Sequence, residues 1–294
     1  MATFFGTNAV DNFPGTPAAD TIFGAGGNDN LDGSDGNDNI YGDSGNDVLI
    51  GGAGLDFIYG GEGNDTLNAT QPGDDSLFGG IGNDVYRLSR TNTDTIIEGL
   101  NQGIDTVRSS VTNSLFLLNA NLENLVLTGA ANIDGTGNNL DNQITGNAGN
   151  NDLFGLGGND VLTGAGGNDV LTGGFGNDQF IFNTAFPASG IDTINDFVVG
   201  SDTIVLDLTF FPALETVAGT LLLATDFAVI DSLPIAEEFQ AATNAEEIVY
   251  NRQTGNLFYN ANDAVLGFGV GGGQFARIVG SPNTFSNTDV RAIA

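Results

Sequence analysis

A nine-residue period runs from Gly15 to Arg87 and constrains the fold more than any other feature of the sequence. A fixed period of this kind is typical of repeat architectures, in which each unit stacks on its neighbours. The count slips once, by one extra residue at Ala69. Each unit has Asp at its sixth place: Asp20, Asp29, Asp38, Asp47, Asp56, Asp65, Asp75 and Asp84. Each unit has a large apolar residue at its eighth place: Ile22, Leu31, Ile40, Leu49, Ile58, Leu67, Leu77 and Tyr86.

Each unit is predicted to form a turn followed by a short strand. Its first six places are rich in Gly, Asn and Asp, which adopt turn and left-handed conformations at low cost. Its last three places point outward, inward and outward, as in a strand. Two units then make one coil, and stacked coils pair their strands in parallel about 4.8 Å apart. The sequence therefore predicts an all-β solenoid with the eighth-place residues in its core.

This stacking would place the sixth-place carboxylates in two columns, one on each edge of the solenoid. Bare columns of like charge repel, whereas calcium between successive turns would accept six to eight oxygen ligands. One buried Ile or Leu per unit contributes about 1.5–3 kcal/mol, but ordering each of the nine backbones costs about 1–2 kcal/mol. We therefore predict that the segment is largely disordered without calcium. The alternative is a metal-free solenoid with solvated Asp side chains.

The units GGEGNDTLN and GGIGNDVYR closely match the consensus GGxGxDxUx, and here the chain resembles the RTX, or haemolysin-type calcium-binding, repeats. The resemblance implies a right-handed parallel β-roll with calcium in its turns. It implies that the sixth-place Asp side chains and glycine carbonyls are the calcium ligands. It also implies export by type I secretion machinery, directed by an uncleaved C-terminal signal, and hence a secreted, extracellular or cell-surface protein.

A second repeat block runs from Gly137 to Ile181. Its sixth places hold Asn142, Asn151, Asp160, Asp169 and Asp178. Because Asn offers only a neutral oxygen, we expect weak or no calcium binding at its first two turns. The predicted metal ligands here are Asp160, Asp169 and Asp178.

The rhythm of glycines divides the chain into five segments. The segment between the blocks and the one after them stay β-like without the period. Their acids are either metal ligands or, as we favour, turn residues: Asp94, Asp105, Asp192, Asp196 and Asp202.

Phe4, Phe5 and Phe13 are predicted to cover the open end of the first coil. In the last segment, Ile194, Phe197, Ile204 and Leu206 would close the core. A short helix at 235–247, a hairpin at 247–263 and a strand at 275–279 are also expected there. The segments are 1–14 (N-terminal cap), 15–87 (first RTX β-roll), 88–136 (connecting β-solenoid coils), 137–181 (second RTX β-roll) and 182–294 (C-terminal cap and secretion-signal region).

The composition excludes several classes of function. The formal net charge is -31 with six basic residues, so the chain lacks the basic surface that binds nucleic acid. Without His, Cys or Lys it cannot form a usual catalytic triad, a thiol nucleophile, a Schiff base or a His-ligated zinc site. The N-terminus lacks the pattern of a signal peptide, and no apolar run is long enough for membrane insertion. We therefore expect calcium as the cofactor and no enzymatic activity.

Aromatic residues recur at the ninth place of alternate units: Phe23, Tyr41, Tyr59 and Phe78. Because the ninth place points outward, they are predicted to form a ladder on one face. The ladder either stabilises the sheet or contacts a glycan, a second copy of the chain or the C-terminal region.

The function we favour is a secreted calcium-binding protein with a structural role at the cell surface or in the matrix. A calcium-dependent adhesin or glycan-binding module is the alternative, and a polysaccharide-acting enzyme is the least favoured interpretation.

Overall fold

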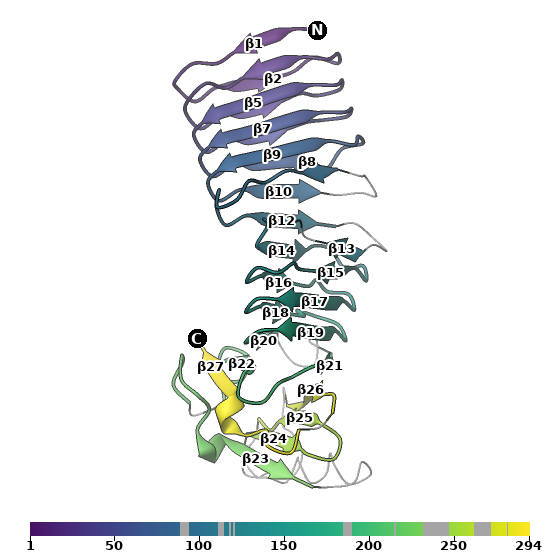
Figure 1. The fold of residues 1–294 in the computed structure, drawn as a ribbon, viewed down its shortest axis with the longest axis vertical. Coiled ribbons are helices and arrows are strands. Elements are labelled where there is room, and N and C mark those ends of the chain that lie inside the picture. The colour runs from purple at the N-terminus through teal and green to yellow at the C-terminus, as the bar shows by residue number, and fades with distance from the viewer. Residues whose placement is uncertain are drawn as a thin grey trace. The chain divides into compact units, whose positions relative to one another are not determined.

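The computed structural model describes residues 1–88, 94–110, 115–117, 119, 121–184, 190–214, 216–231, 247–261, 272–280 and 282–294. The helix expected at 235–247 falls almost wholly outside these residues. The chain divides into two compact units, 1–128 and 129–294. Both are built almost entirely of β-strands, so the predicted all-β class is confirmed (Figure 1).

Unit 1 consists of parallel strands that alternate between two sheets. The first sheet contains β1 (Thr3–Phe5), β3 (Thr21–Phe23), β5 (Asn39–Ser44), β7 (Phe57–Glu62), β9 (Ser76–Ile81) and β11 (Thr95–Ile96). The second contains β2 (Asn12–Pro14), β4 (Asn30–Asp32), β6 (Val48–Ile50), β8 (Thr66–Ala69), β10 (Val85–Leu88), β12 (Thr106–Ser109) and β14 (Asn124–Leu127). Strand β13 (Leu115–Leu117) also belongs to this unit. The result is a parallel β-roll, and Figure 1 shows β5, β7 and β9 side by side in successive coils.

The register follows the nine-residue period, two units to a coil. Ile22 pairs with Ile40, and Ile40 with Ile58. All eight eighth-place residues are fully buried, so they form the predicted core. The extra residue Ala69 is accommodated as the buried last residue of β8.

The first 14 residues form a coil of the roll in their own right. Phe4 pairs with Ile22, Phe13 pairs with Leu31, and the two rings lie 5.9 Å apart. Phe4 and Phe13 therefore extend the core as expected. Phe5 instead lies outside, 72 % exposed, because it continues the outward-facing ninth place.

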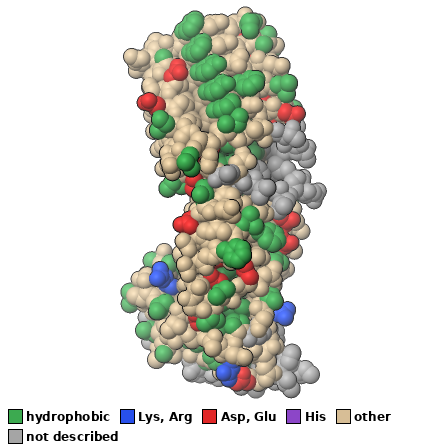
Figure 2. All heavy atoms as spheres, in the orientation of Figure 1, with side chains coloured by type: hydrophobic (Ala, Val, Ile, Leu, Met, Phe, Trp, Pro, Cys, Tyr) green, Lys and Arg blue, Asp and Glu red, His purple; other side chains and the backbone are tan. Residues whose placement is uncertain are grey.

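The predicted aromatic ladder is present on the outer face of the first sheet. Its ring centroids are 4.9 Å apart between Phe23 and Tyr41, 4.8 Å between Tyr41 and Tyr59, and 4.5 Å between Tyr59 and Phe78. Phe5 adds a fifth ring, 5.4 Å from Phe23. Figure 2 shows hydrophobic side chains in a row over this part of the molecule.

Unit 2 also consists mainly of parallel strands, and its sequence of paired strands includes two antiparallel pairs. One sheet contains β16 (Gln143–Thr145), β18 (Val161–Thr163), β20 (Gln179–Phe182), β22 (Thr203–Asp207) and β27 (Val290–Ile293). The other contains β15 (Asp134–Thr136), β17 (Asp152–Gly157), β19 (Val170–Phe175), β21 (Asp192–Ile194), β26 (Gly273–Ile278), β25 (Asn256–Tyr259), β24 (Ile248–Asn251) and β23 (Phe227–Ile230). Two short 3-10 helices, η1 (Ala224–Asp226) and η2 (Asn287–Asp289), complete the described elements.

The C-terminal part of unit 2 closes its core. Ile194, Phe197, Ile204 and Leu206 are buried there as predicted. Strands β24 and β25 form the expected antiparallel hairpin, and β26 supplies the expected later strand.

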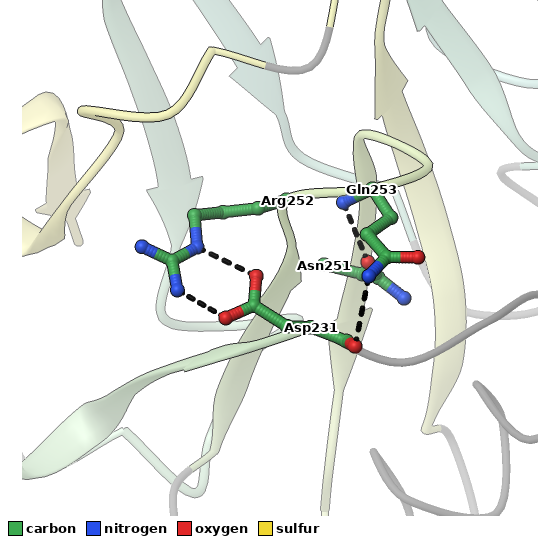
Figure 3. A network of polar contacts seen from close by, with 4 residues as sticks. All are labelled: Asp231, Asn251, Arg252 and Gln253. Atoms are coloured by element: carbon green, nitrogen blue, oxygen red, sulfur yellow. Dashed lines mark hydrogen bonds and ion pairs between the residues drawn. The ribbon is translucent and has the colours of Figure 1, made fainter.

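A polar network surrounds the turn of this hairpin (Figure 3). The Arg252 guanidinium makes an ion pair with the Asp231 carboxylate, and Gln253 donates to the Asp231 carbonyl at 3.1 Å. The backbone N–H of Gln253 donates to Oδ1 of Asn251 at 2.8 Å. These contacts fix the ends of β23 and β24 to each other.

In the described part of the chain, no helix has the length and hydrophobicity needed to cross a membrane.

Candidate metal centres

The sixth-place side chains connect successive coils through one carboxylate oxygen each. Oδ1 of Asp38 accepts the backbone N–H of Asp20 at 2.7 Å, and Oδ1 of Asp56 accepts the N–H of Asp38 at 2.8 Å. Each bond spans 18 residues, one coil of the roll. The same bond runs from Asp29 to Asp47, Asp47 to Asp65, Asp56 to Asp75, Asp65 to Asp84, Asn142 to Asp160, Asn151 to Asp169 and Asp160 to Asp178. The structure thus assembles the predicted columns.

The second oxygen of most of these carboxylates is buried and has no donor. This is true of Oδ2 in Asp29, Asp38, Asp47, Asp56, Asp65, Asp75, Asp84, Asp160, Asp169 and Asp178. A buried charged oxygen without a partner is costly. Among the described residues, the one ion pair joins Arg252 to Asp231, so no Arg neutralises the columns. These oxygens therefore require a cation or a proton.

The first-place glycines leave room for a cation beside these oxygens. A Cβ on Gly24 would lie 2.5 Å from Oδ2 of Asp29 and 2.8 Å from the carbonyl oxygen of Gly42 in the next coil. A Cβ on Gly42 would lie 2.6 Å from the carbonyl oxygen of Gly60 and would also clash with Oδ2 of Asp47. A carboxylate oxygen and a neutral carbonyl oxygen therefore face the same small space. Calcium prefers this mixture of oxygen ligands, so the residues present fit the ion that the sequence predicts.

All the turns except the one at Asp75 are of two kinds, which we call open and closed. In an open turn the second-place residue has a left-handed backbone, and the sixth-place Oδ2 has no donor. The second-place residues of the open turns are Ala25, Ser34, Asp43, Gly52, Gly61, Gly80, Leu156, Ala165 and Gly174. Non-glycine residues seldom adopt this conformation without a reason. The Asp75 turn has the donor-free oxygen without the left-handed residue.

In a closed turn the second-place N–H donates to the sixth-place side chain. Thr16 donates to Oδ2 of Asp20 from its N–H at 2.8 Å and from its hydroxyl at 2.7 Å. The N–H of Asn138 donates to Oδ1 of Asn142 at 2.7 Å. The N–H of Asn147 donates to Oδ1 of Asn151 at 2.8 Å. A closed turn satisfies its own acceptor and has less need of an ion.

The electrostatics separate the two kinds of turn. Burial raises the pKa of Asp38 and Asp47 to about 6, and that of Asp56 and Asp65 to about 7. In the closed turn, the Thr16 hydroxyl holds the pKa of Asp20 below its usual value.

In the second block, burial likewise raises the pKa of Asp160 to about 7. A bound cation would therefore stabilise the charged form of the carboxylates in the open turns.

The columns extend beyond the repeat, which the sequence analysis did not favour. Asp94 accepts the N–H of Asp75 at 3.0 Å, and Asp105 accepts that of Asp84 at 2.8 Å. Asp192 and Asp202 do the same for Asp169 and Asp178, each at 3.0 Å. The signal that would have found them is an acid directly before a short β-branched run.

Two other acids lie near the ends of the columns, and only one of them continues a column. Asp196 accepts the N–H groups of Gly173 and Gly174 at 3.0 and 2.8 Å, so it caps a turn. Glu123 was not considered from the sequence. Its Oε2 accepts the N–H of Asp105 at 2.8 Å and so continues the column.

The fifth-place Asn residues form a further ladder that was missed. Oδ1 of Asn28 accepts the N–H of Asn46 at 2.9 Å, and Oδ1 of Asn46 accepts that of Asn64 at 2.8 Å. The recurrence of Asn before the sixth-place Asp was the available signal. These bonds link coils at the exposed rim, outside the buried columns.

The family comparison agrees with this geometry. The model of the RTX calcium-binding nonapeptide repeat matches residues 5–40, 14–49, 41–71, 69–89, 136–171 and 145–180. A search of curated proteins finds no match. The matched segments cover both blocks in which the carboxylate columns lie. Residues 5–89 and 136–180 of the chain are therefore RTX calcium-binding nonapeptide repeats, as the sequence predicted.

Proposed function

We propose that this calcium-binding RTX-type protein is secreted, folds when it meets extracellular calcium, and has a structural role at the cell surface or in the extracellular matrix. The observation that carries the proposal is the set of ten buried Asp Oδ2 atoms without donors. Without an ion, these carboxylates oppose the stacking of the coils. With calcium, the same atoms hold successive coils together.

Linkage explains how calcium can control folding. An ion that binds only the folded chain adds about 1.4 kcal/mol per independent site at ten times its dissociation constant. Extracellular calcium modules bind with dissociation constants of about 10⁻⁴–10⁻³ M. Several such sites together would outweigh the repulsion and the ordering entropy. At low internal calcium the chain would stay unfolded and suited to passage through the type I secretion machinery.

The test is a calcium titration followed by circular dichroism and light scattering, with magnesium as the control. We expect β-structure to appear cooperatively with calcium and not at equal magnesium, because magnesium requires stricter octahedral geometry. Light scattering reports self-association in the same experiment. A chain that is fully compact in a strong chelator contradicts the proposal.

The C-terminal strand suggests how export and folding exclude each other. In the folded chain β27 pairs with β22, and Val290 and Ala292 are buried. If the secretion signal that the resemblance implies includes residues 289–294, much of it is buried in the folded chain and becomes fully accessible only on unfolding. Export by a type I system should fall when calcium is supplied inside the producing cell. Undiminished export of calcium-folded protein would contradict this part of the proposal.

A glycan-binding role is the second candidate, and the aromatic ladder favours it. Five rings stack on an outward-facing sheet, and Phe5 at the end of the stack is largely exposed. The other four rings are half-buried, and a continuous apolar stripe on an outer face is typical of contact surfaces. Replacing Phe23, Tyr41, Tyr59 and Phe78 with Ser should reduce retention on polysaccharide while calcium affinity is kept. Unchanged retention and assembly would leave the ladder a purely structural element.

We further propose that the chain is not an enzyme, because it has no His, Cys or Lys. A pair of carboxylates could still act in glycoside hydrolysis. A polysaccharide substrate screen with the calcium-loaded protein tests this, and turnover of any substrate would overturn the proposal.

A further inference from the structure

The coil after the first repeat block has an acid where the repeats have glycine. In the pairing of β9 with β11, Leu77 lies opposite Ile96. Two residues further along each strand, Gly79 therefore corresponds to Glu98. Gly79 is the first-place glycine of the last unit, so Glu98 takes the first place of the following coil.

We call the space beside each first-place glycine a cation cradle. The presence of Glu98 changes the oxygen atoms that surround the cradle at Gly79. A Cβ on Gly24 or Gly42 would meet one Asp oxygen and the glycine carbonyl of the next coil. A Cβ on Gly79 would instead clash with Oδ2 of Asp84, the hydroxyl of Tyr86 and Oε1 of Glu98. Three side-chain oxygens thus converge on one space, and a carboxylate replaces the neutral carbonyl.

Asp105 brings a third carboxylate to the same place. One oxygen from each of Asp84, Glu98 and Asp105 lies within 4.8 Å of the others. At calcium–oxygen distances of about 2.4 Å, ligands on opposite sides of the ion are about 4.8 Å apart, so all three can reach one calcium ion. In the described part of the chain, this is the one cluster of three acids with such spacing.

The burial and hydrogen bonding of these groups point to a ligand. Asp84 and Asp105 are each 1 % exposed. Oδ2 of Asp84 and Oε2 of Glu98 are buried without donors. Tyr86, the only aromatic residue at an eighth place of the first block, donates its hydroxyl proton to Oε1 of Glu98. Its oxygen keeps lone pairs for a cation.

We propose that Asp84, Glu98, Asp105 and the Tyr86 hydroxyl form a cation site that binds calcium more tightly than the glycine-carbonyl cradles of the repeats. Its three carboxylates attract a cation more strongly than one carboxylate and a carbonyl do, since affinity in calcium sites rises with ligand charge. This site lies at the C-terminal end of the first block and would hold the most tightly bound ion of that block. The inference rests on the proposed calcium binding and assigns a distinct role to a residue outside the repeat.

Terbium is the probe, because Tb³⁺ replaces calcium and emits when a nearby tyrosine transfers its excitation energy. The chain has no Trp, so its five Tyr residues are the main donors. Terbium is titrated into the calcium-free full-length chain, and tyrosine-excited emission is recorded. We expect emission from the tightest site, and we expect Tyr86→Phe to abolish most of it without loss of bound terbium. The matched control is Tyr59→Phe in the ladder, which should leave the emission unchanged.

The Glu98→Gln variant tests the ligand itself. It should weaken the emitting site about tenfold or more, since losing a charge-assisted contact costs at least about 1.4 kcal/mol. Glu62→Gln is the control, because exposed Glu62 at the end of β7 loses the same charge away from the cluster.

The outcomes separate this inference from the proposed function. If Glu98→Gln fails to fold, Tyr86→Phe still decides, because it keeps all three carboxylates. A calcium-folded protein whose emission survives Tyr86→Phe overturns the inference alone. A chain that binds neither terbium nor calcium overturns the proposed function as well.

Discussion

The turns at Asp169 and Asn151 occupy successive coils on one edge of the second block, yet they treat their sixth-place side chains differently. At Asn151 the side-chain amide donates to the carbonyl of Ile133 at 2.6 Å, and its Oδ1 accepts the N–H of Asn147. At Asp169 the carboxylate has a buried Oδ2 without a donor, and Ala165 is left-handed. The backbone N–H of Asn151 still donates to Oδ1 of Asp169 at 2.8 Å, so the coils stack alike.

The comparison shows that stacking and cation demand are separable. Stacking on the preceding coil needs one side-chain hydrogen bond from the sixth place, which Asp56 makes as an acceptor and Asn151 makes as an amide donor. Cation demand needs a second, negatively charged oxygen that the turn leaves unsatisfied. The closed turn at Asp20 shows that Asp alone is not sufficient, because Thr16 satisfies its second oxygen.

The largest expected effect comes from removing charge at an open turn. Asp56→Asn keeps the acceptor for Asp38 but removes the charged Oδ2, so the calcium midpoint for folding should rise several-fold. Each lost site would remove about 1.4 kcal/mol at ten times its dissociation constant. Asp20→Asn is the matched control at a closed turn, and its midpoint should stay close to that of the parent chain. Equal shifts in the two variants, measured by circular dichroism, would erase the distinction between open and closed turns.

Protons should partly substitute for calcium at open turns. Burial raises the pKa of Asp56, Asp65 and Asp160 to about 7, whereas an unfolded Asp titrates near about 3.9. Between these values the folded chain binds more protons, so its stability rises as pH falls. In chelator, folded structure should therefore increase as the solution is acidified from about pH 7.5 towards about pH 5. The pKa of Asp20 is lowered in the folded chain, so its contribution to stability decreases as the pH falls.

General repulsion in this acidic chain would give the same trend, so ionic strength is the control. Salt at about 1 M reduces the Debye length to about 3 Å and screens exposed charges, but buried carboxylates much less. Urea unfolding in chelator at several pH values measures the effect. A pH dependence that vanishes in high salt would show that the open turns do not cause it.

The repeat predicted the architecture well because its period fixes both strand register and core. Ile22, Ile40 and Ile58 are paired and buried as expected, since an eighth-place residue has no other face available. The same counting failed where the glycine rhythm stops. Asp105 and Glu98 lie between the blocks, where only the stacking of strands, and not spacing in the sequence, aligns them with Asp84 and Gly79.

The division into open and closed turns was also beyond sequence counting. It depends on whether the second-place N–H points at the sixth-place side chain. Thr16, Asn138 and Asn147 do so, whereas Ala25 and Leu156 adopt left-handed conformations instead. A polar side chain at the second place was the only available hint, and Ser34 and Asp43 break even that rule.

A smaller change in stability is expected when a substitution gives a closed turn the charged sixth-place oxygen of an open turn. Asn151→Asp loses the amide bond to the Ile133 carbonyl, which should cost about 0.5–1.5 kcal/mol in chelator. In calcium, the new carboxylate should recover that loss and add one bound ion. Urea unfolding with and without calcium, together with calorimetric ion counting, measures both. A variant equally destabilised in both conditions would show that position 151 cannot hold calcium.

The smallest expected effect separates the sheet face from the turns. Tyr59 stacks between Tyr41 and Phe78, and each cross-strand aromatic pair is worth about 0.2–1 kcal/mol, so Tyr59→Leu should lower stability in saturating calcium by about 1 kcal/mol. Phe57→Leu on the same strand is the control, since the described residues show no ring contact for Phe57. Because the ladder lies outside the carboxylate columns, the calcium dependence of Tyr59→Leu should follow from its stability change alone. A calcium midpoint that shifts more than the measured stability loss requires would show that the outer face and the turns are coupled.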